Sequence, residues 1–123
     1  AKRNGAVLAV LTPAEWCLLF DAQEGRCYIC LVPLRNRYFP ETTTHAKVVA
    51  ALDHEHALQR KLEAAGMTRT EAIRRSLRGF LCFWDNRNVI GVALKDDADK
   101  AQRAADYLRD PPARRIITSG DHP

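Results

Sequence analysis

The segment ALDHEHAL, residues 51–58, places two carboxylates and two imidazoles side by side directly after the apolar run VVAAL. The apolar run predicts a short buried strand at about 47–52 with the polar cluster at its end. The cluster consists of Asp53, His54, Glu55 and His56. An acid at a strand end can bind a hard divalent cation, and an adjacent imidazole can take a proton from water near neutral pH. The alternative is an exposed polar start of the next helix, with Asp53 as its N-cap.

Length, composition and charge limit the class of protein. With 123 residues, 46% of them apolar and 28% charged, the chain has the size of one domain, residues 1–123. The net charge of +4 and the pI of about 9.1 favour an anionic partner no more than an ordinary solvated surface. No apolar run reaches the roughly 18 residues that span a bilayer. The N-terminal stretch leads into TPAE, a helix start, so we expect no signal peptide, no membrane partner and an intracellular location.

Two of the four cysteines have the spacing of a metal-binding or redox pair. They are Cys27 and Cys30 in CYIC, and the other two are Cys17 and Cys82. A redox pair belongs at a strand-to-helix turn, whereas this pair runs into LVPLRNRYFPETTT, which is typical of a loop and hairpin. Zinc is therefore the favoured interpretation, since a reducing compartment disfavours structural disulfides. Cys17 is interpreted as a small core residue of the first helix.

The first helix, expected at residues 11–24, has the clearest signals. Thr12 is a good N-cap, Pro13 suits the first helical position, and Glu15 completes a capping box. Gly25 ends the helix. The side chains predicted to face the core are Trp16, Leu19 and Phe20.

Two short helices and a last amphipathic helix follow. Residues 57–66 read as a helix with Leu58 and Leu62 on its buried side, and TRTE at 68–71 is a second capping box. The last helix is expected at 96–109, where DPPARR ends it because two prolines cannot continue a helix. The residues of this helix expected to face inward are Ala98, Ala101, Ala105 and Leu108. The tail IITSGDHP is expected to be frayed.

Several motifs stand in a defined order along the chain. CxxC at 27–30 is followed by DHxH at 53–56 and by RGFLCFWDN at 78–86. Gly91 and the pair YL at 107–108 complete the set. In this order the motifs resemble those of the HNH nucleases, in particular the phage recombination endonuclease VII family, over about residues 15–109.

The resemblance implies an α+β fold, a small and mostly helical domain around a zinc-stapled ββα-metal core (the HNH or His-Me finger core). By this analogy the catalytic core spans residues 26–91. It carries a helical insert at 57–77 where the family has a brief connection. The first helix, 11–24, and the last helix, 96–109, flank this core.

The resemblance also implies roles for the site residues. Asp53 and Asn86 would ligate one Mg²⁺ or Mn²⁺ ion, and His54 would be the general base that activates water. His56 would contact the metal or the scissile phosphate, and Arg78 would contact a DNA phosphate. These roles suit phosphodiester hydrolysis, which needs an activated nucleophile and positive charge at the phosphate and the leaving oxygen.

Two positions depart from the family's pattern. Zinc would be held by Cys27, Cys30, Cys82 and Asp85. The family has a cysteine where this chain has Asp85, although a carboxylate oxygen can also bind zinc. The alternatives for the fourth ligand are Cys17 and His45, or zinc is absent. Gly91 lies one residue later than the pattern prefers, so Asn88 is the alternative to Asn86 as metal ligand.

The function implied by the resemblance is metal-dependent DNA cleavage in phage recombination, of a structure-selective or Holliday-junction-resolving type. Members of that family act on branched DNA as homodimers, which would place two sites on opposed strands. A phage enzyme of this kind would work in the cytoplasm of its bacterial host. The alternatives are a simple nicking or packaging-associated HNH nuclease and a zinc-containing module that binds DNA without cutting it. The DHEH cluster with Asn86 favours an enzyme, because a pure binding module does not need it.

Overall fold

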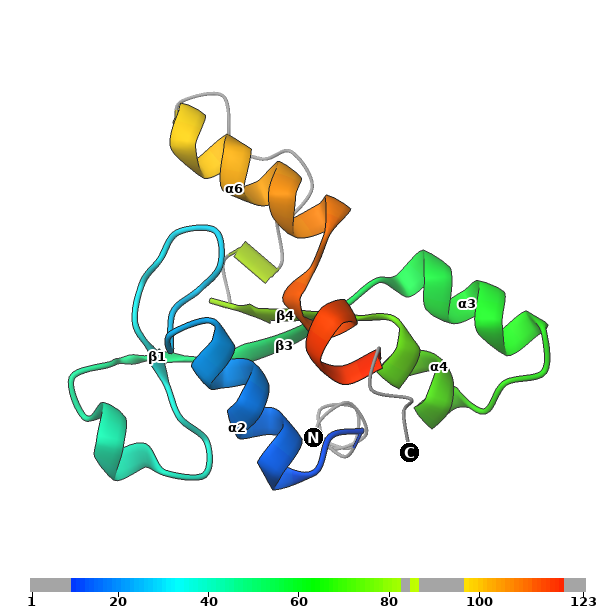
Figure 1. Cartoon of the computed structure of the whole chain (residues 1–123), viewed down its shortest axis with the longest axis horizontal. Helices are drawn as coiled ribbons and strands as arrows, with labels where there is room; N and C mark the ends of the chain where they lie inside the picture. Colours follow the sequence, from blue (N-terminus) through cyan, green and yellow to red (C-terminus); the bar gives the residue numbers. More distant parts are fainter. Residues whose placement is uncertain (1–9, 83–84, 87–96, 119–123) are drawn as a thin grey trace.

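The computed structural model describes residues 10–82, 85–86 and 97–118 and has the predicted α+β architecture (Figure 1). The helices are α2 (Pro13–Ala22), α3 (His56–Ala64), α4 (Arg69–Arg75) and α6 (Ala98–Arg109), with short helical turns η1 (Pro40–Thr43) and η3 (Arg114–Thr118). The strands are β1 (Leu34–Arg35), β2 (Val48–Val49), β3 (Ala51–His54) and β4 (Leu77–Leu81). Across these described ranges, no helix combines the length and the apolar character that crossing a membrane requires.

The antiparallel pair of β3 and β4 runs through the middle of the molecule (Figure 1). The strand expected at 47–52 is instead two strands, because the chain leaves β2, which pairs with β1, and enters β3 two residues later. Within the β3–β4 pair, Asp53 lies opposite Gly79 and His54 opposite Leu77, so the register shifts between these two pairs. The extra residue is Arg78 on β4, so the shift is a bulge of that strand, which bends it and increases the local twist.

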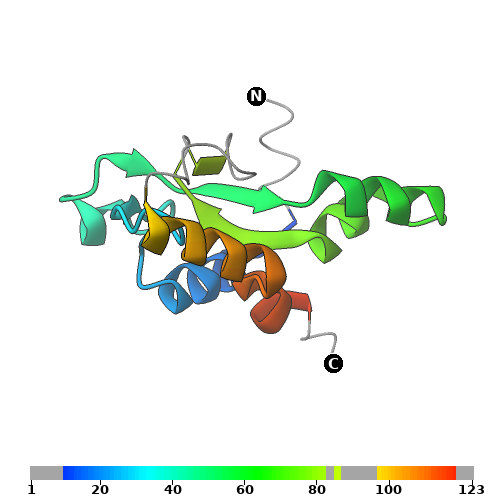
Figure 2. The same cartoon turned by 90° about the horizontal axis from the view of Figure 1, so that it is seen from above.

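Helix α2 packs its aromatic face against β4. The predicted capping box is present, since Glu15 N bonds to Thr12 Oγ1 and Thr12 N bonds to Glu15 Oε1. The predicted inward face of Trp16, Leu19 and Phe20 is buried. The Trp16 ring centroid lies 4.6 Å from that of Phe80 on β4. Figure 2 shows α2 (blue) and α6 (yellow to orange) on the same side of the β3–β4 pair.

The position of Gly79 on β4 allows three parts of the chain to meet. A Cβ atom there would lie 2.6 Å from Gln23 Oε1, 3.0 Å from Pro112 Cγ and 3.1 Å from Tyr107 Cε1. Gln23 uses its amide to bond both the N–H and the carbonyl of Phe80, at 2.8 Å and 2.9 Å. The glycine of the RG motif therefore serves the close approach of α2 and the C-terminal segment to this strand.

Helices α3 and α4 form an antiparallel hairpin beyond one end of the strand pair (Figure 1). Thr68 caps α4 by accepting a hydrogen bond from the backbone of Glu71, which is one half of the predicted capping box, and the Glu71 carboxylate accepts from Arg75 Nε. The prediction that Leu58 and Leu62 form the buried side of α3 was wrong. Both are only half-buried, whereas Gln59 is buried. The polar residue occupies the inward position because it bonds to the end of β3, as described below.

Helix α6 begins after its N-cap Asp97 and ends at Arg109, as expected, but it turns a different face inward. Its buried residues are Ala104 and Tyr107. The residues expected to face inward, Ala98, Ala101, Ala105 and Leu108, are exposed or half-buried. The prediction followed the aliphatic side chains, whereas the large ring of Tyr107 takes the core position. The prediction of a frayed tail was also wrong in part, because η3 continues to residue 118 and Ile117 is buried.

Candidate active site and metal centre

A cluster of three cysteines and one aspartate lies where the CxxC loop meets the end of β4. Its members are Cys27, Cys30, Cys82 and Asp85, and their ligand atoms all lie within 4.8 Å of one another. Cys30 Sγ lies 3.7 Å from Cys82 Sγ, and Cys27 Sγ lies 3.2 Å from Asp85 Oδ2. A tetrahedral zinc ion with bonds of about 2.3 Å places two sulfur ligands roughly 3.8 Å apart. The donor set and its spacing fit zinc, and the cluster could bind a structural ion of this kind.

The alternative fourth ligands lie outside this cluster. Cys17 is half-buried on α2 and packs against the core, as interpreted from the sequence. His45 is exposed after η1. Among the residues that the structure describes, Asp85 is therefore the fourth member of the cluster, beside the three cysteines.

Without a cation, the thiols of the cluster are expected to carry protons, which a bound ion would replace. Burial raises the pKa of the Cys27 thiol to about 11 and also raises the pKa of Cys30. Burial acts to raise the pKa of Asp85 too, but hydrogen bonds from the three thiols and the charge of Lys100 lower it below its usual value. Lys100 Nζ lies 3.6 Å from Asp85 Oδ1. Binding of a cation would release protons from these thiols and stabilise the folded cluster.

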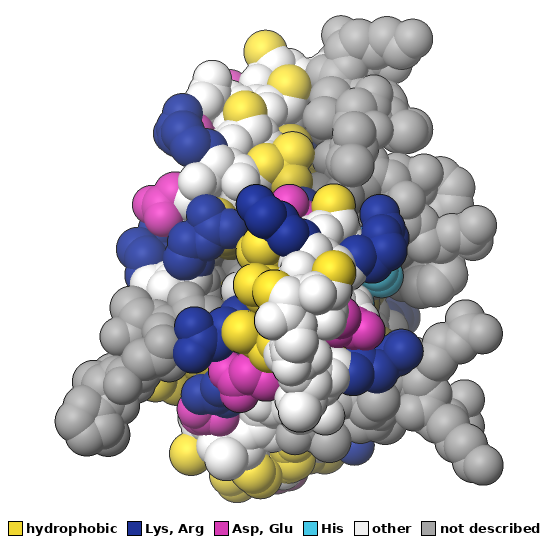
Figure 3. Space-filling model, turned by 90° about the vertical axis from the view of Figure 1, so that its right-hand side faces the viewer, with side chains coloured by type: hydrophobic (Ala, Val, Ile, Leu, Met, Phe, Trp, Pro, Cys, Tyr) yellow, Lys and Arg dark blue, Asp and Glu magenta, His cyan; other side chains and the backbone are white. Residues whose placement is uncertain are grey.

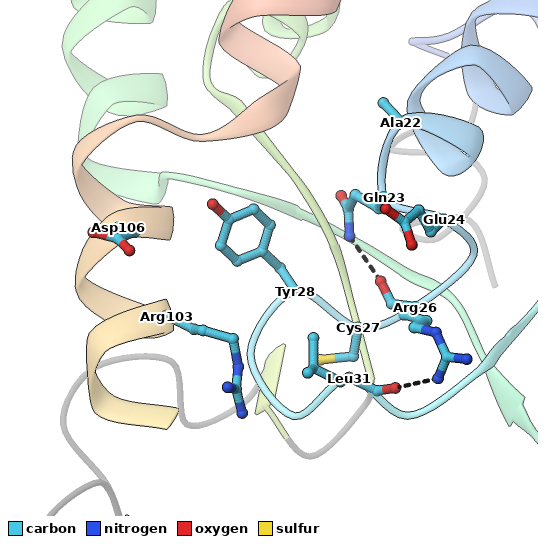
Figure 4. Close-up of a pocket in the computed structure, with 9 residues that line it drawn as sticks. All are labelled: Ala22, Gln23, Glu24, Arg26, Cys27, Tyr28, Leu31, Arg103 and Asp106. Atoms are coloured by element: carbon cyan, nitrogen blue, oxygen red, sulfur yellow. Dashed lines mark hydrogen bonds between the residues drawn. The ribbon is translucent and has the colours of Figure 1, made fainter. Parts of the chain in front are cut away.

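Arg103 on α6 and Arg26, in the segment after α2, both bond to the CxxC loop. Arg103 on α6 donates from Nε to the carbonyl of Ile29 at 2.6 Å, and Arg26 donates to the carbonyl of Leu31 at 3.1 Å. Figure 4 shows this region, where a cavity of about 280 Å³ separates the loop from α6. Leu31 adopts a left-handed conformation with φ of 65°, which closes the loop after the second cysteine. These protein contacts stabilise the loop conformation in addition to any contribution from a bound ion.

The carboxylate of Asp53 is buried and bonded from two elements. Arg78 on β4 donates from Nε to Asp53 Oδ2 at 2.8 Å, and Tyr107 on α6 donates its hydroxyl proton to the same oxygen at 2.7 Å. The second oxygen, Oδ1, has a longer contact of 3.4 Å with Arg78 Nη2. Burial, followed by the charge of Asp53, raises the pKa of Tyr107 well above its usual value, which keeps the phenol a donor. The structure thus brings Asp53 and Arg78 together as an ion pair.

The imidazole of His54 is held from helix α3. His54 Nε2 lies 2.7 Å from Gln59 Oε1, and Gln59 Nε2 donates to Glu63 Oε2 at 2.7 Å. Burial lowers the pKa of His54, although the Gln59 hydrogen bond acts in the opposite direction, so the ring is neutral near pH 7. The ring of the exposed His56 lies alongside, with centroids 4.3 Å apart. His54 is therefore a partly enclosed, uncharged imidazole at the end of β3.

The alternative interpretation, an exposed helix start with Asp53 as its N-cap, is wrong. Asp53 and His54 are 5% and 8% exposed, and the N-cap of α3 is Glu55, whose side chain makes no capping hydrogen bond. Sequence reasoning missed two partners of this pair, Gln59 and Tyr107. A polar residue inside an amphipathic helix was the available signal for Gln59. The YL motif contained Tyr107 but did not indicate what its hydroxyl contacts.

Asn86 follows directly after the cysteine-rich cluster. Its backbone N–H bonds to the carbonyl of Cys82 at 2.9 Å, and its side chain is half-buried. Asn88 and Gly91 lie outside the described residues. A carboxylate with one weakly contacted oxygen, Asp53 Oδ1, and an amide are oxygen donors of the kind that suits Mg²⁺, which fills its remaining positions with water and substrate phosphate. The donor chemistry of Asp53 and Asn86 therefore fits the predicted ion.

Fold and site together define a small α+β protein with a cysteine-rich site that could bind zinc. The chain belongs to the recombination endonuclease VII family, whose profile matches residues 2–110. Its similarity to two curated proteins, both named Gene 59 protein, extends over 107 residues, or 87% of this chain. The identity is 30% for the protein of Mycobacterium phage D29 and 28% for that of Mycobacterium phage L5. The chain spans about half the length of these relatives, 48% and 49%. No solved structure matches.

Proposed function

We propose that the protein is a metal-dependent DNA endonuclease of the HNH type, in which His54 is the general base. The observation that carries this proposal is the adjacent pair at the end of β3, a buried carboxylate beside a neutral imidazole held at one nitrogen. A neutral imidazole with one free nitrogen can accept a proton from water. Membership in a family of endonucleases supports DNA as the substrate.

In this proposal each residue has a role in hydrolysis of a phosphodiester. His54 takes a proton from the attacking water, which makes that water a stronger nucleophile. Asp53 and Asn86 would hold a Mg²⁺ or Mn²⁺ ion, which when bound supplies positive charge to the phosphate and the leaving 3′ oxygen. Arg78 and Tyr107 keep the Asp53 carboxylate in one orientation through Oδ2. Separate zinc binding by the cysteine-rich cluster would stabilise the turn that carries Asn86.

Two further side chains belong to the proposal. His56 is exposed beside the His54 ring, from where its imidazole can reach the bound phosphate or metal. Arg78 is 9% exposed and paired with Asp53, so in the free protein its charge is committed to that carboxylate. We propose that it also contacts a DNA phosphate when the substrate is bound. A guanidinium can serve both partners, because it has donors on more than one edge.

The surface near the α3–α4 hairpin suits an anionic polymer. Arg60, Lys61 and Arg69 are exposed on the hairpin, and the chain has a net charge of +4. Figure 3 shows Lys and Arg side chains spread over this face, with a smaller number of acidic ones between them. We propose branched DNA as the preferred substrate, cut by a homodimer with one site on each strand during phage recombination in the host cytoplasm.

Cleavage assays test this proposal. Purified protein is incubated with supercoiled plasmid and with a four-way junction, in Mg²⁺ and in EDTA. We expect metal-dependent cutting that falls by about 10² to 10⁴ in His54→Ala, since that is the usual cost of losing a general base. His45→Ala is the matched control, because it removes an exposed imidazole outside the β3 site.

The outcomes separate the alternatives. A folded His54→Ala protein that cuts at nearly the wild-type rate would remove His54 from the mechanism. DNA binding in a gel-shift assay without any cutting, in every metal tried, would identify a binding module instead. Cutting of plasmid with no preference for the junction would favour a simple nicking or packaging-associated nuclease.

A further inference from the structure

We propose that Gln59 and Glu63 are positioning residues that hold His54 in the tautomer with its proton on Nε2, which leaves Nδ1 as the basic atom. The chain of contacts runs from His54 Nε2 to Gln59 Oε1 at 2.7 Å and from Gln59 Nε2 to Glu63 Oε2 at 2.7 Å. The consequence for catalysis rests on the proposed role of His54 as the base. The tautomer itself does not depend on that role.

The chemistry of the donors and acceptors gives this chain one direction. An ionised carboxylate only accepts hydrogen bonds, so Gln59 must turn its NH₂ group toward Glu63. The amide oxygen then faces His54, and because an amide oxygen only accepts, His54 Nε2 must be the donor. A neutral imidazole has one N–H, so the lone pair lies on Nδ1. Glu63 therefore sets the tautomer of His54 through an intervening amide.

The burial of Gln59 shows that this arrangement is part of the fold. Gln59 is 8% exposed on a helix whose leucines are only half-buried. A buried amide destabilises the fold unless its oxygen and NH₂ group are both hydrogen-bonded, and here each has a partner. Glu63 follows Gln59 by four residues, one turn along the same face of α3. The two residues thus act as one rigid unit.

The chain of contacts from Glu63 through Gln59 to His54, here called the relay, gives a role to the predicted insert at 57–77. Helix α3 lies within this segment except for its first residue. Its first turns carry Gln59 and Glu63 back to the end of β3. The backbone supports this placement, since Gln59 N bonds to Glu55 O at 3.0 Å and Glu55 N bonds to Ser76 O at 2.9 Å. The α3 segment therefore orients the proposed base.

The decisive measurement is the tautomer of His54 by long-range ¹H–¹⁵N NMR correlation in the full chain, without DNA. The wild-type protein should show the proton on Nε2. Glu63→Gln can present either its oxygen or its NH₂ group to Gln59, so it should leave a mixture of tautomers. Glu63→Lys offers only donors, so the Gln59 amide should turn over and move the His54 proton to Nδ1. Gln59→Leu removes the acceptor and should leave a mixture of tautomers.

Cleavage rates complete the test. We expect Glu63→Lys and Gln59→Leu to cut DNA about 10 to 10³ times more slowly than wild type, because a base in the wrong tautomer is inactive. Glu71→Gln removes a carboxylate of α4 that is bonded to Arg75 and lies outside these contacts, so it should stay within about threefold and controls for the lost negative charge. Circular dichroism verifies that each variant is folded.

The outcomes keep the two proposals apart. A wild-type His54 with its proton on Nδ1, or no change of tautomer in Glu63→Lys, overturns the relay whatever the cleavage rates are. A tautomer shift in Glu63→Lys without loss of cleavage also contradicts it as a positioning device. If the tautomers behave as expected but His54→Ala still cuts DNA normally, the base assignment fails and the relay remains.

Discussion

The hydroxyl of Tyr107 on α6 bonds to Oδ2 of Asp53 on β3 at 2.7 Å, across 54 residues of sequence. The Tyr107 ring also packs against the ring of Tyr28 in the CxxC loop, with centroids 5.2 Å apart. Arg103, one turn earlier on α6, holds the same loop through the carbonyl of Ile29. One helix therefore contacts both the candidate catalytic carboxylate and the loop of the metal cluster, and couples their positions.

Tyr107→Phe should weaken both stability and cleavage. The ring stays, but Asp53 loses one of its two short hydrogen bonds in a buried place, which costs about 1 to 2 kcal/mol of unfolding free energy. We expect slower cleavage at every Mg²⁺ concentration because Asp53 is less well oriented. Urea unfolding and cleavage rates measure the two effects. Tyr28→Phe keeps the ring pair and is the control, and equal losses in both variants would contradict a specific role for the Tyr107 hydroxyl.

Asn86→Ala should reduce Mg²⁺-dependent cleavage without releasing zinc, because the two ions would occupy separate sites. Asp53→Asn should have the same effect while keeping a hydrogen-bonding group opposite Arg78. Cleavage rates at several Mg²⁺ concentrations and zinc content by mass spectrometry distinguish these sites. Asn88→Ala is the matched control. If it abolishes cleavage and Asn86→Ala does not, the assigned ligand is displaced by two residues.

Replacement of Asp85 should change zinc affinity in both directions. Asp85→Cys offers a fourth thiolate, so zinc should bind more tightly than in the wild-type protein. Asp85→Ala leaves three cysteines, and both zinc affinity and the melting temperature should fall because metal binding stabilises the folded state. Competition with a chelator and thermal unfolding give these values. A purified wild-type protein without zinc that stays folded in chelator would show that the cysteines are core residues only.

The ion pair between α2 and α4 should make stability depend on acid pH. Hydrogen bonding to Arg74, at 2.6 Å and 2.9 Å, lowers the pKa of Glu15 from 4.5 to about 2. A carboxyl whose pKa falls on folding stabilises the protein above its unfolded pKa, so this contribution is complete above about pH 4.5 and is lost as the pH falls toward 2. Both side chains are 28% exposed, so screening by solvent limits the contribution to about 1 kcal/mol.

Glu15→Gln isolates this contribution, because glutamine keeps the capping box with Thr12 but carries no charge. The variant should be less stable than wild type by about 1 kcal/mol near pH 6 and nearly equal near pH 2, as measured by urea unfolding. Glu71→Gln removes a more exposed carboxylate, bonded to Arg75, and should change stability by only a few tenths of a kcal/mol. A constant difference for Glu15→Gln at all pH values would contradict the pKa shift.

Local sequence signals determined the helices and the motif order of this protein. Thr12, Pro13 and Glu15 predicted the start of α2 correctly, because a capping box involves neighbours within one turn. The expected range 96–109 agrees with α6 within two residues, because the prolines after Arg109 are also a local signal. The resemblance carried by CxxC, DHxH and RGFLCFWDN was confirmed as family membership. These signals act over short distances or as a set of spacings, so they are readable without knowing how the chain packs.

Only the tertiary structure decided which side chains meet. Cys27 and Asp85 are 58 residues apart and Asp53 and Tyr107 are 54 apart, so their contacts depend on how β4 and α6 pack rather than on any local pattern. Gln59 is buried instead of the leucines beside it, because a hydrogen bond to His54 and a second one to Glu63 outweigh the loss of apolar burial. Helical periodicity ranks side chains by hydrophobicity and cannot show that a distant strand offers a polar partner. The orientation of the proposed base therefore follows from packing, whereas its identity follows from the sequence.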